Sequence, residues 1–323
     1  MISYPVETKF TSRRNIMKKF LSFITALLLF ILCLTGCNHN SSSEDEKLKV
    51  VATIFPQYDF ARQIAKDCAD IRMLIPPGGE SHGFEPTTSD IIAISECDVF
   101  IYTGGESDTY IDTILATVKN ENMTVISLLD DCITPYPVGH TFNEGDHSDI
   151  DEHIWTSPKN AVVICEKLCE VFAEKDAENA AFYRENLRNL TSELRSLDEE
   201  FRDITENAKR NNLVFGDRFP LGYFADAYHL HCYTAFSGCS DDTEASASQV
   251  AELVDIIKRD NIPVVFKIEL SSGTIADTIS KETGAEVMTF YSCHNVSKDD
   301  FENGETYLTL MRRNLESLRI ALN

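Results

Sequence analysis

Four residues of this sequence have side chains that bind divalent metals and lie where a fold could bring them together. They are His82, His153, Asp217 and His294, two in each half of the chain. Three of them come directly after predicted strands, and the other comes just before a predicted helix start. In parallel α/β sheets, ligands bind beyond the carboxyl ends of the strands. Imidazole and carboxylate suit a borderline divalent metal such as Zn²⁺ in tetrahedral geometry. No compact finger-type spacing is present, so the fold must assemble the site.

Further metal-site candidates lie close to these four in the sequence. Glu269 ends a predicted strand, and we expect it to hydrogen-bond a helix start or to orient a ligand rather than bind metal directly. Cys293 is a rival to its neighbour His294 as a thiolate ligand. Glu80 and His147 are additional candidates. His147 lies in an acidic loop between 140 and 153, which is either a solvated loop or a weak metal-gathering loop.

The charge balance argues against nucleic acid as a partner. The chain has 323 residues with 52 Asp and Glu against 29 Lys and Arg, a net charge of −23. Phosphate binding needs clustered Lys and Arg, whereas an acidic surface attracts cations. At 43% hydrophobic residues the chain can bury a large core, in one large domain or two lobes. This composition excludes collagenous, coiled-coil and wholly disordered classes.

Short apolar runs alternate with helical periods, which predicts parallel βαβ units. We expect strands at 48–54, 71–75, 98–102, 124–128, 213–215, 233–236, 264–268 and 286–290. From Leu187 onward, apolar residues recur every three or four positions, which predicts a long helix over about 179–209. The fold class is therefore α/β, with two lobes that each hold a mostly parallel sheet flanked by helices, joined by one long rigid helix. The expected boundaries are 48–178, 179–210 and 211–323.

The N-terminus has the pattern of an export signal. Lys18 and Lys19 precede an apolar run at 20–34, which is shorter than the roughly 18 residues of a membrane span. The run ends in Leu-Thr-Gly-Cys37, which resembles a bacterial lipobox. We therefore expect a signal peptide at 1–36 with Met17 as the true start, lipidation of Cys37, and a flexible tether at 37–47. The alternative is a short membrane anchor with an incidental cysteine.

Eight cysteines remain after Cys33 in the signal and the lipidated Cys37. Cys239 and Cys293 each follow a predicted strand of the second lobe and are the preferred disulfide, which an external compartment permits. Free thiols are the alternative.

Three stretches resemble the metal-binding receptor lipoproteins of ABC importers for zinc and manganese. They are GGESHGFEPT at 78–87, DEHIWTSP at 151–158 and GETYLTLMRRN at 304–314. The resemblance covers essentially the whole chain from Lys47 onward, and it implies that His82 and His153 are metal ligands.

The second lobe departs from the pattern of that family. The family usually places His or Glu after the first strand of this lobe, and an ungapped count puts Arg218 there, a cation that cannot serve. Asp217 is one residue away and chemically able. The family's fourth position is normally Asp, or is empty, where this chain offers Cys293 and His294.

The resemblance implies a binding protein and not an enzyme. The chain would be a monomer anchored at the outer face of the cytoplasmic membrane. It would capture Zn²⁺ between its lobes, with Mn²⁺ or Fe²⁺ as alternative cargo, and deliver it to the permease of an ABC importer powered by a separate ATPase subunit. Three imidazoles and one carboxylate favour zinc over manganese.

Two other function classes remain open at this point. An extracellular zinc hydrolase would need a general base at an open coordination position, for which Glu80 or Glu269 could be argued, but HExxH-type spacing is missing. A surface adhesin is allowed by the lipid anchor.

Overall fold

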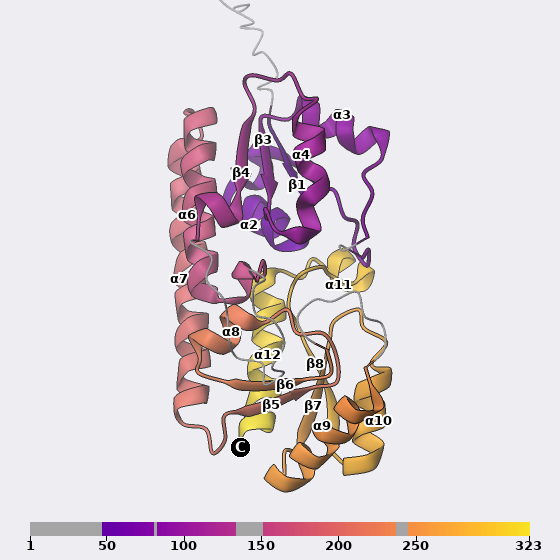
Figure 1. The fold of residues 1–323 in the computed structure, drawn as a ribbon. Coiled ribbons are helices and arrows are strands. Elements are labelled where there is room, and N and C mark those ends of the chain that lie inside the picture. Colours follow the sequence, from indigo (N-terminus) through magenta and orange to yellow (C-terminus); the bar gives the residue numbers. More distant parts are fainter. Residues whose placement is uncertain (1–46, 81–82, 134–150, 237–244) are drawn as a thin grey trace, which may run out of the picture. The chain divides into compact units, whose positions relative to one another are not determined.

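Two four-stranded parallel sheets organise the computed structural model, which describes residues 47–80, 83–133, 151–236 and 245–323 (Figure 1). The first sheet has the strand order β2-β1-β3-β4 and the second has the order β6-β5-β7-β8. The second sheet thus repeats the topology of the first, with every pair of neighbouring strands parallel. We call each sheet with its flanking helices a lobe. The α/β prediction with two lobes is confirmed.

The first lobe contains the elements β1 (Leu48–Ala52), α2 (Phe55–Ala65), η1 (Lys66–Cys68), β2 (Ala69–Met73), α3 (Thr88–Glu96), β3 (Val99–Tyr102), η2 (Glu106–Asp108), α4 (Thr109–Leu115), β4 (Thr124–Ser127) and α5 (Leu128–Asp131). It is followed by η3 (Ile154–Thr156), α6 (Pro158–Lys175) and α7 (Ala180–Glu206). The second lobe contains β5 (Asn212–Phe215), α8 (Gly222–Ala227), β6 (His231–Thr234), α9 (Ala247–Asp260), β7 (Val264–Ile268), α10 (Thr274–Thr283), β8 (Glu286–Phe290), α11 (Lys298–Glu302) and α12 (Tyr307–Leu322).

The strands bury side chains on both faces, as parallel strands between helices must. In β1, Val50 and Ala52 belong to a central core, whereas Val51 packs in a separate cluster with Ile94 of α3 and Ile111 of α4. The second sheet is arranged in the same way, with α9 and α10 covering its other face. The near-continuous apolar runs in the sequence have this two-sided burial as their cause.

The predicted long helix is α7, with 27 residues. Its buried side chains Leu190, Leu194, Leu197, Phe201 and Ile204 recur every three or four positions and form one face. This face packs against α2 of the first lobe and α12, and the Phe201 ring lies 5.0 Å from an aromatic ring of α8. One continuous helix therefore contacts elements of both lobes.

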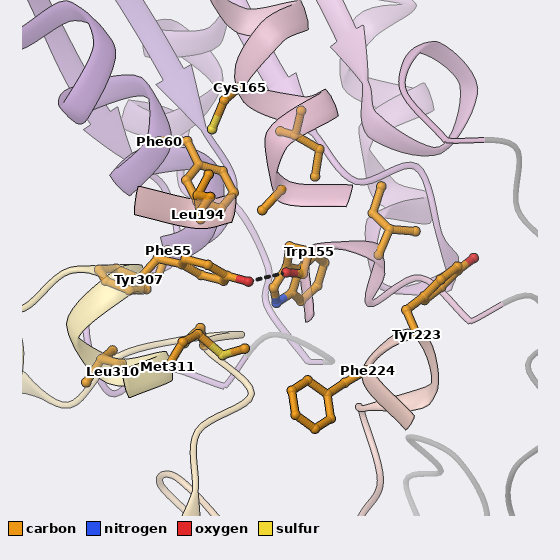
Figure 2. Packing of buried hydrophobic residues seen from close by; sticks show 14 of the residues in the cluster. Phe55, Phe60, Trp155, Cys165, Leu194, Tyr223, Phe224, Tyr307, Leu310 and Met311 are labelled. Atoms are coloured by element: carbon orange, nitrogen blue, oxygen red, sulfur yellow. Dashed lines mark hydrogen bonds between the residues drawn. The ribbon is translucent and has the colours of Figure 1, made fainter. Parts of the chain in front are cut away.

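The C-terminal helix α12 was not expected from periodicity. Thr306 caps its first turn by accepting a hydrogen bond from Thr309 N. The Tyr307 backbone N–H donates to the buried carboxylate of Asp59 on α2 (2.9 Å), and the Tyr307 hydroxyl donates to the Trp155 carbonyl (2.7 Å; Figure 2). The start of α12 thus ties the end of the chain to the first lobe.

Strand ends differ from prediction by about two residues at β1, β2 and β6, which were expected at 48–54, 71–75 and 233–236. Strand β6 begins at His231, which is exposed, so the apolar run in the sequence starts later than the hydrogen-bonded ladder.

Across the described ranges, helices that combine the length and apolar character needed to cross a membrane are absent. The predicted signal peptide, Cys37 and the tether through residue 46 lie outside those ranges, and the predicted lobe boundaries stay predictions.

Candidate metal site

The rings of His153 and His294 lie together, with centroids 5.0 Å apart and an interplanar angle of 74°. His153 directly precedes η3, and His294 lies in the loop after β8 of the second lobe. The indole of Trp155 packs 5.2 Å from the His294 ring. The structure therefore brings together two of the four predicted ligands, one from each half of the sequence.

The His153 imidazole is held by Asp151. Its Nδ1 lies 2.7 Å from Asp151 Oδ1, and its backbone N–H donates to the same oxygen at 2.9 Å. A carboxylate hydrogen-bonded to one ring nitrogen is the arrangement that commonly orients imidazoles in metal sites. His153 is also buried. The sequence shows Asp151 only as part of the 151–158 motif, but an Asp two residues before the His is typical of a turn in which the carboxylate accepts the later backbone N–H.

One buried carboxylate holds the segment that leads to His153, and a second shapes the loop to which that segment is fastened. Glu152 accepts hydrogen bonds from the backbone N–H (3.2 Å) and the hydroxyl of Ser107. Asp108 accepts from the Thr103 N–H (2.7 Å) and the Gly104 N–H (3.2 Å), which shapes the loop after β3. The segment before His153 is thereby fastened to the end of a central strand of the first sheet.

Burial raises the pKa of Asp108 from 3.8 to about 6, with the Glu152 charge adding to the rise against two backbone hydrogen bonds that lower it. Because the folded-state pKa lies above the unfolded one, the stability that Asp108 contributes is fully present below pH 3.8 and is lost as the pH rises through 6. Asparagine does not ionise, so this loss is absent in Asp108→Asn. The variant should therefore match wild type near about pH 4 and be more stable by roughly 3 kcal/mol near about pH 7.

Urea unfolding of metal-free protein across this pH range measures the effect. Asp112→Asn, at an exposed position on α4, is the matched control and should track wild type. Parallel pH profiles for Asp108→Asn and wild type would contradict the prediction.

Glu269 contacts the loop of His294 and not a helix start. Its Oε2 and Oε1 accept the backbone N–H and the hydroxyl of Ser292, both at 2.7 Å. Burial raises the Glu269 pKa to about 7, against the lowering effect of these hydrogen bonds. The carboxylate is therefore in a position to orient the residues around His294.

Cys293 is a free, fully buried thiol in this structure. The expected disulfide to Cys239 is thus not formed at Cys293, whose side chain packs in the central core; Cys239 itself lies outside the described residues. Burial raises the pKa of the Cys293 thiol well above its ordinary value. The His294 ring, in contrast, lies against the His153 ring, which makes His294 the better candidate of the two.

Asp217 lies at the carboxyl end of β5, as predicted, and is buried. Its Oδ1 accepts the Arg218 N–H (2.9 Å) and its Oδ2 accepts the Ile268 N–H at the end of β7 (3.3 Å). Glu80 is 68% exposed, and its Oε1 lies 3.9 Å from Arg218 Nη1. Glu80 is therefore in an exposed ion pair, and Arg218 faces an acid from the first lobe.

His82 and His147 lie outside the described residues. Among the residues that the structure does describe, groups of three or more His, Cys, Asp or Glu able to hold a metal are not found. The described part supplies a pair of imidazoles with a supporting carboxylate, and the full ligand set stays a prediction.

Residues 50–321 match the sequence profile of ZnuA, described as zinc-uptake complex component A, periplasmic. The chain belongs to the ZnuA family. It is similar to the zinc-binding lipoprotein AdcA of Streptococcus pneumoniae, with 29% identity over 304 residues, which cover 91% of this chain and 60% of AdcA. It is also similar to the high-affinity zinc uptake system protein ZnuA of Bacillus subtilis, with 28% identity over 309 residues, covering 93% and 96%.

A solved structure supports the same fold. The Zn(II)-bound ZnuA-like domain of Streptococcus pneumoniae AdcA aligns with a TM-score of 0.73 and 28% identity, covering 85% of this chain and 99% of that domain. This chain spans about 60% of the length of the AdcA relatives that it matches. The similarity therefore covers the ZnuA-like part of AdcA, with its two α/β lobes.

Proposed function

We propose that this chain is an extracytoplasmic receptor that binds Zn²⁺ between its two lobes and delivers it to the permease of an ABC importer. The observation that carries this proposal is the packing of His153 against His294, two imidazoles from different halves of the chain. The zinc-binding names of its relatives support Zn²⁺ as the cargo.

The proposed ligands are His82, His153, His294 and Asp217. With Nδ1 of His153 oriented by Asp151, the ring nitrogen proposed to bind the metal is Nε2. Each oxygen of Asp217 accepts one backbone hydrogen bond, so lone pairs remain for a metal. Nitrogen-rich coordination favours zinc over Mn²⁺, which prefers more oxygen ligands, and over Fe²⁺, which binds such sites more weakly.

The remaining parts of the proposal concern location and partners. The signal at 1–36 would direct export, and lipid on Cys37 would hold the monomeric receptor at the outer face of the cytoplasmic membrane. A separate ATPase subunit of the importer would power uptake, and the receptor itself would perform no catalysis. The lipoprotein and uptake-system names of the relatives support this arrangement.

Calorimetric titration of the purified, metal-free protein with Zn²⁺, Mn²⁺ and Fe²⁺ tests the proposal. We expect one Zn²⁺ per chain, bound more tightly than either competitor, and release of protons as the ligands lose them on binding. A chain that binds none of the three metals, or binds Mn²⁺ more tightly than Zn²⁺, would contradict it.

A further inference from the structure

Ser292 is a buried junction of four hydrogen bonds. Its N–H and hydroxyl both donate to Glu269 at 2.7 Å, and its hydroxyl oxygen accepts the His294 N–H at 3.2 Å. Its carbonyl accepts the indole N–H of Trp155 at 3.0 Å. Only 1% of Ser292 is exposed to solvent. One residue thus connects the end of β7, the loop of His294 and the segment of His153.

The bond between Trp155 and Ser292 links the two histidine segments directly. Trp155 is two residues after His153, and Ser292 is two residues before His294. The Tyr307 hydroxyl donates to the Trp155 carbonyl, which holds Trp155 on its other side (Figure 2). Aromatic contacts complete the arrangement, since the indole packs 5.3 Å from the His153 ring and 5.2 Å from the His294 ring.

The backbone between Ser292 and His294 is in a conformation that needs support. Cys293 has a φ of +58°, in the left-handed region that residues with a side chain rarely adopt. Leu270, next to Glu269, also has a positive φ of +66°. Two such residues, on neighbouring loops joined by the Glu269–Ser292 hydrogen bonds, indicate that these bonds hold a specific turn. That turn determines where the His294 imidazole lies.

We propose that Ser292 and Trp155 are positioning residues that set the separation of the His153 and His294 imidazoles before metal binds, with Glu269 holding Ser292. The inference deepens the proposed function and rests on it. Ligands fixed in advance bind metal more tightly, because less freedom is lost on binding, and they impose their own geometry on the metal. Loosening this junction should therefore weaken binding and change the coordination geometry.

Three variants test the junction one bond at a time. Trp155→Phe removes the donor to the Ser292 carbonyl, Ser292→Ala removes the hydroxyl, and Glu269→Gln replaces one acceptor oxygen while keeping the side-chain volume. We expect the first two to raise the Zn²⁺ dissociation constant about 10- to 100-fold, and Glu269→Gln to have a smaller effect in the same direction. Ser292→Thr keeps the hydroxyl and should recover most of the affinity.

A second measurement separates positioning from general loss of stability. The visible absorption of bound Co²⁺ reports coordination geometry, and it should change in Trp155→Phe and Ser292→Ala. The matched control is Tyr183→Phe on α7, which removes the hydrogen bond of a buried tyrosine hydroxyl to Asp176 (2.5 Å), just before that helix. This control should lower the melting temperature yet leave Zn²⁺ affinity and the Co²⁺ spectrum as in wild type.

The outcomes distinguish the two proposals. Wild-type affinity and an unchanged Co²⁺ spectrum in Trp155→Phe and Ser292→Ala would overturn the positioning roles, while Zn²⁺ binding by wild type would leave the proposed function intact. If wild type itself bound no Zn²⁺, the proposed function would fail. Should circular dichroism show that one of the two variants does not fold, Glu269→Gln, which keeps its volume, decides by the same two measurements.

Discussion

Replacing His153 with alanine is expected to raise the dissociation constant for Zn²⁺ by more than about 100-fold. Changes in residues that only support a metal ligand typically cost 10- to 100-fold in affinity, and loss of a ligand itself should exceed that range. His153 is buried, its Nδ1 is held by Asp151, and its ring packs against His294. Competition against a chelating dye, with metal-free protein at fixed pH, measures the change.

His231→Ala is the matched control for this experiment. His231 is an exposed histidine at the start of β6 in the second lobe, so its loss removes the same chemical group from a different place. We expect its Zn²⁺ affinity to equal that of wild type. Equal affinities for His153→Ala and His231→Ala would show that the paired imidazoles do not form the metal site.

The largest loss of stability is expected for Asp59→Ala, which should lower the free energy of unfolding by about 3 kcal/mol. Asp59 is 1% exposed, accepts the Tyr307 N–H at 2.9 Å and pairs with Arg62 at 2.7 Å. Its removal leaves a buried N–H without an acceptor and a partly buried cation without its carboxylate.

Urea unfolding at neutral pH, without metal, measures this loss. The matched control is Asp67→Ala, an exposed acid just after the same helix, which should change stability by less than about 0.5 kcal/mol. A loss in Asp59→Ala no larger than in the control would mean that the contact between α2 and α12 contributes little to stability.

The layout of the two lobes could be predicted because it depends on local patterns. Strands that are buried on both faces need apolar residues at successive positions, so they are visible in the sequence as short apolar runs. Helix α7 has a repeating apolar face over 27 residues, which is visible in the same way. The same reasoning failed at α12, although its buried residues Tyr307, Leu310, Met311, Leu315 and Leu318 follow helical spacing. The helical pattern is thus present in the sequence at α12, where it overlaps the family-like stretch at 304–314.

The site was predictable only in part. The sequence points to His153 and His294 as candidates because each lies beside a predicted element end, where parallel sheets collect their ligands. The hydrogen bond between Trp155 and Ser292 could not be predicted from such local patterns, because the two residues are 137 positions apart. No local pattern specifies such a pair. The Glu269–Ser292 contact has the same character, since it links the ends of two different strands.

The hydrogen bond between the Tyr307 N–H and Asp59 also bears on the order in which parts of the chain fold. These residues are 248 positions apart, and contacts between such distant parts of a chain form slowly. In a chain that is made from its N-terminus onward, the first lobe precedes α12 and lacks this contact until α12 follows. The 16-residue helix α12 therefore supplies a contact of the first lobe that can form only late in folding.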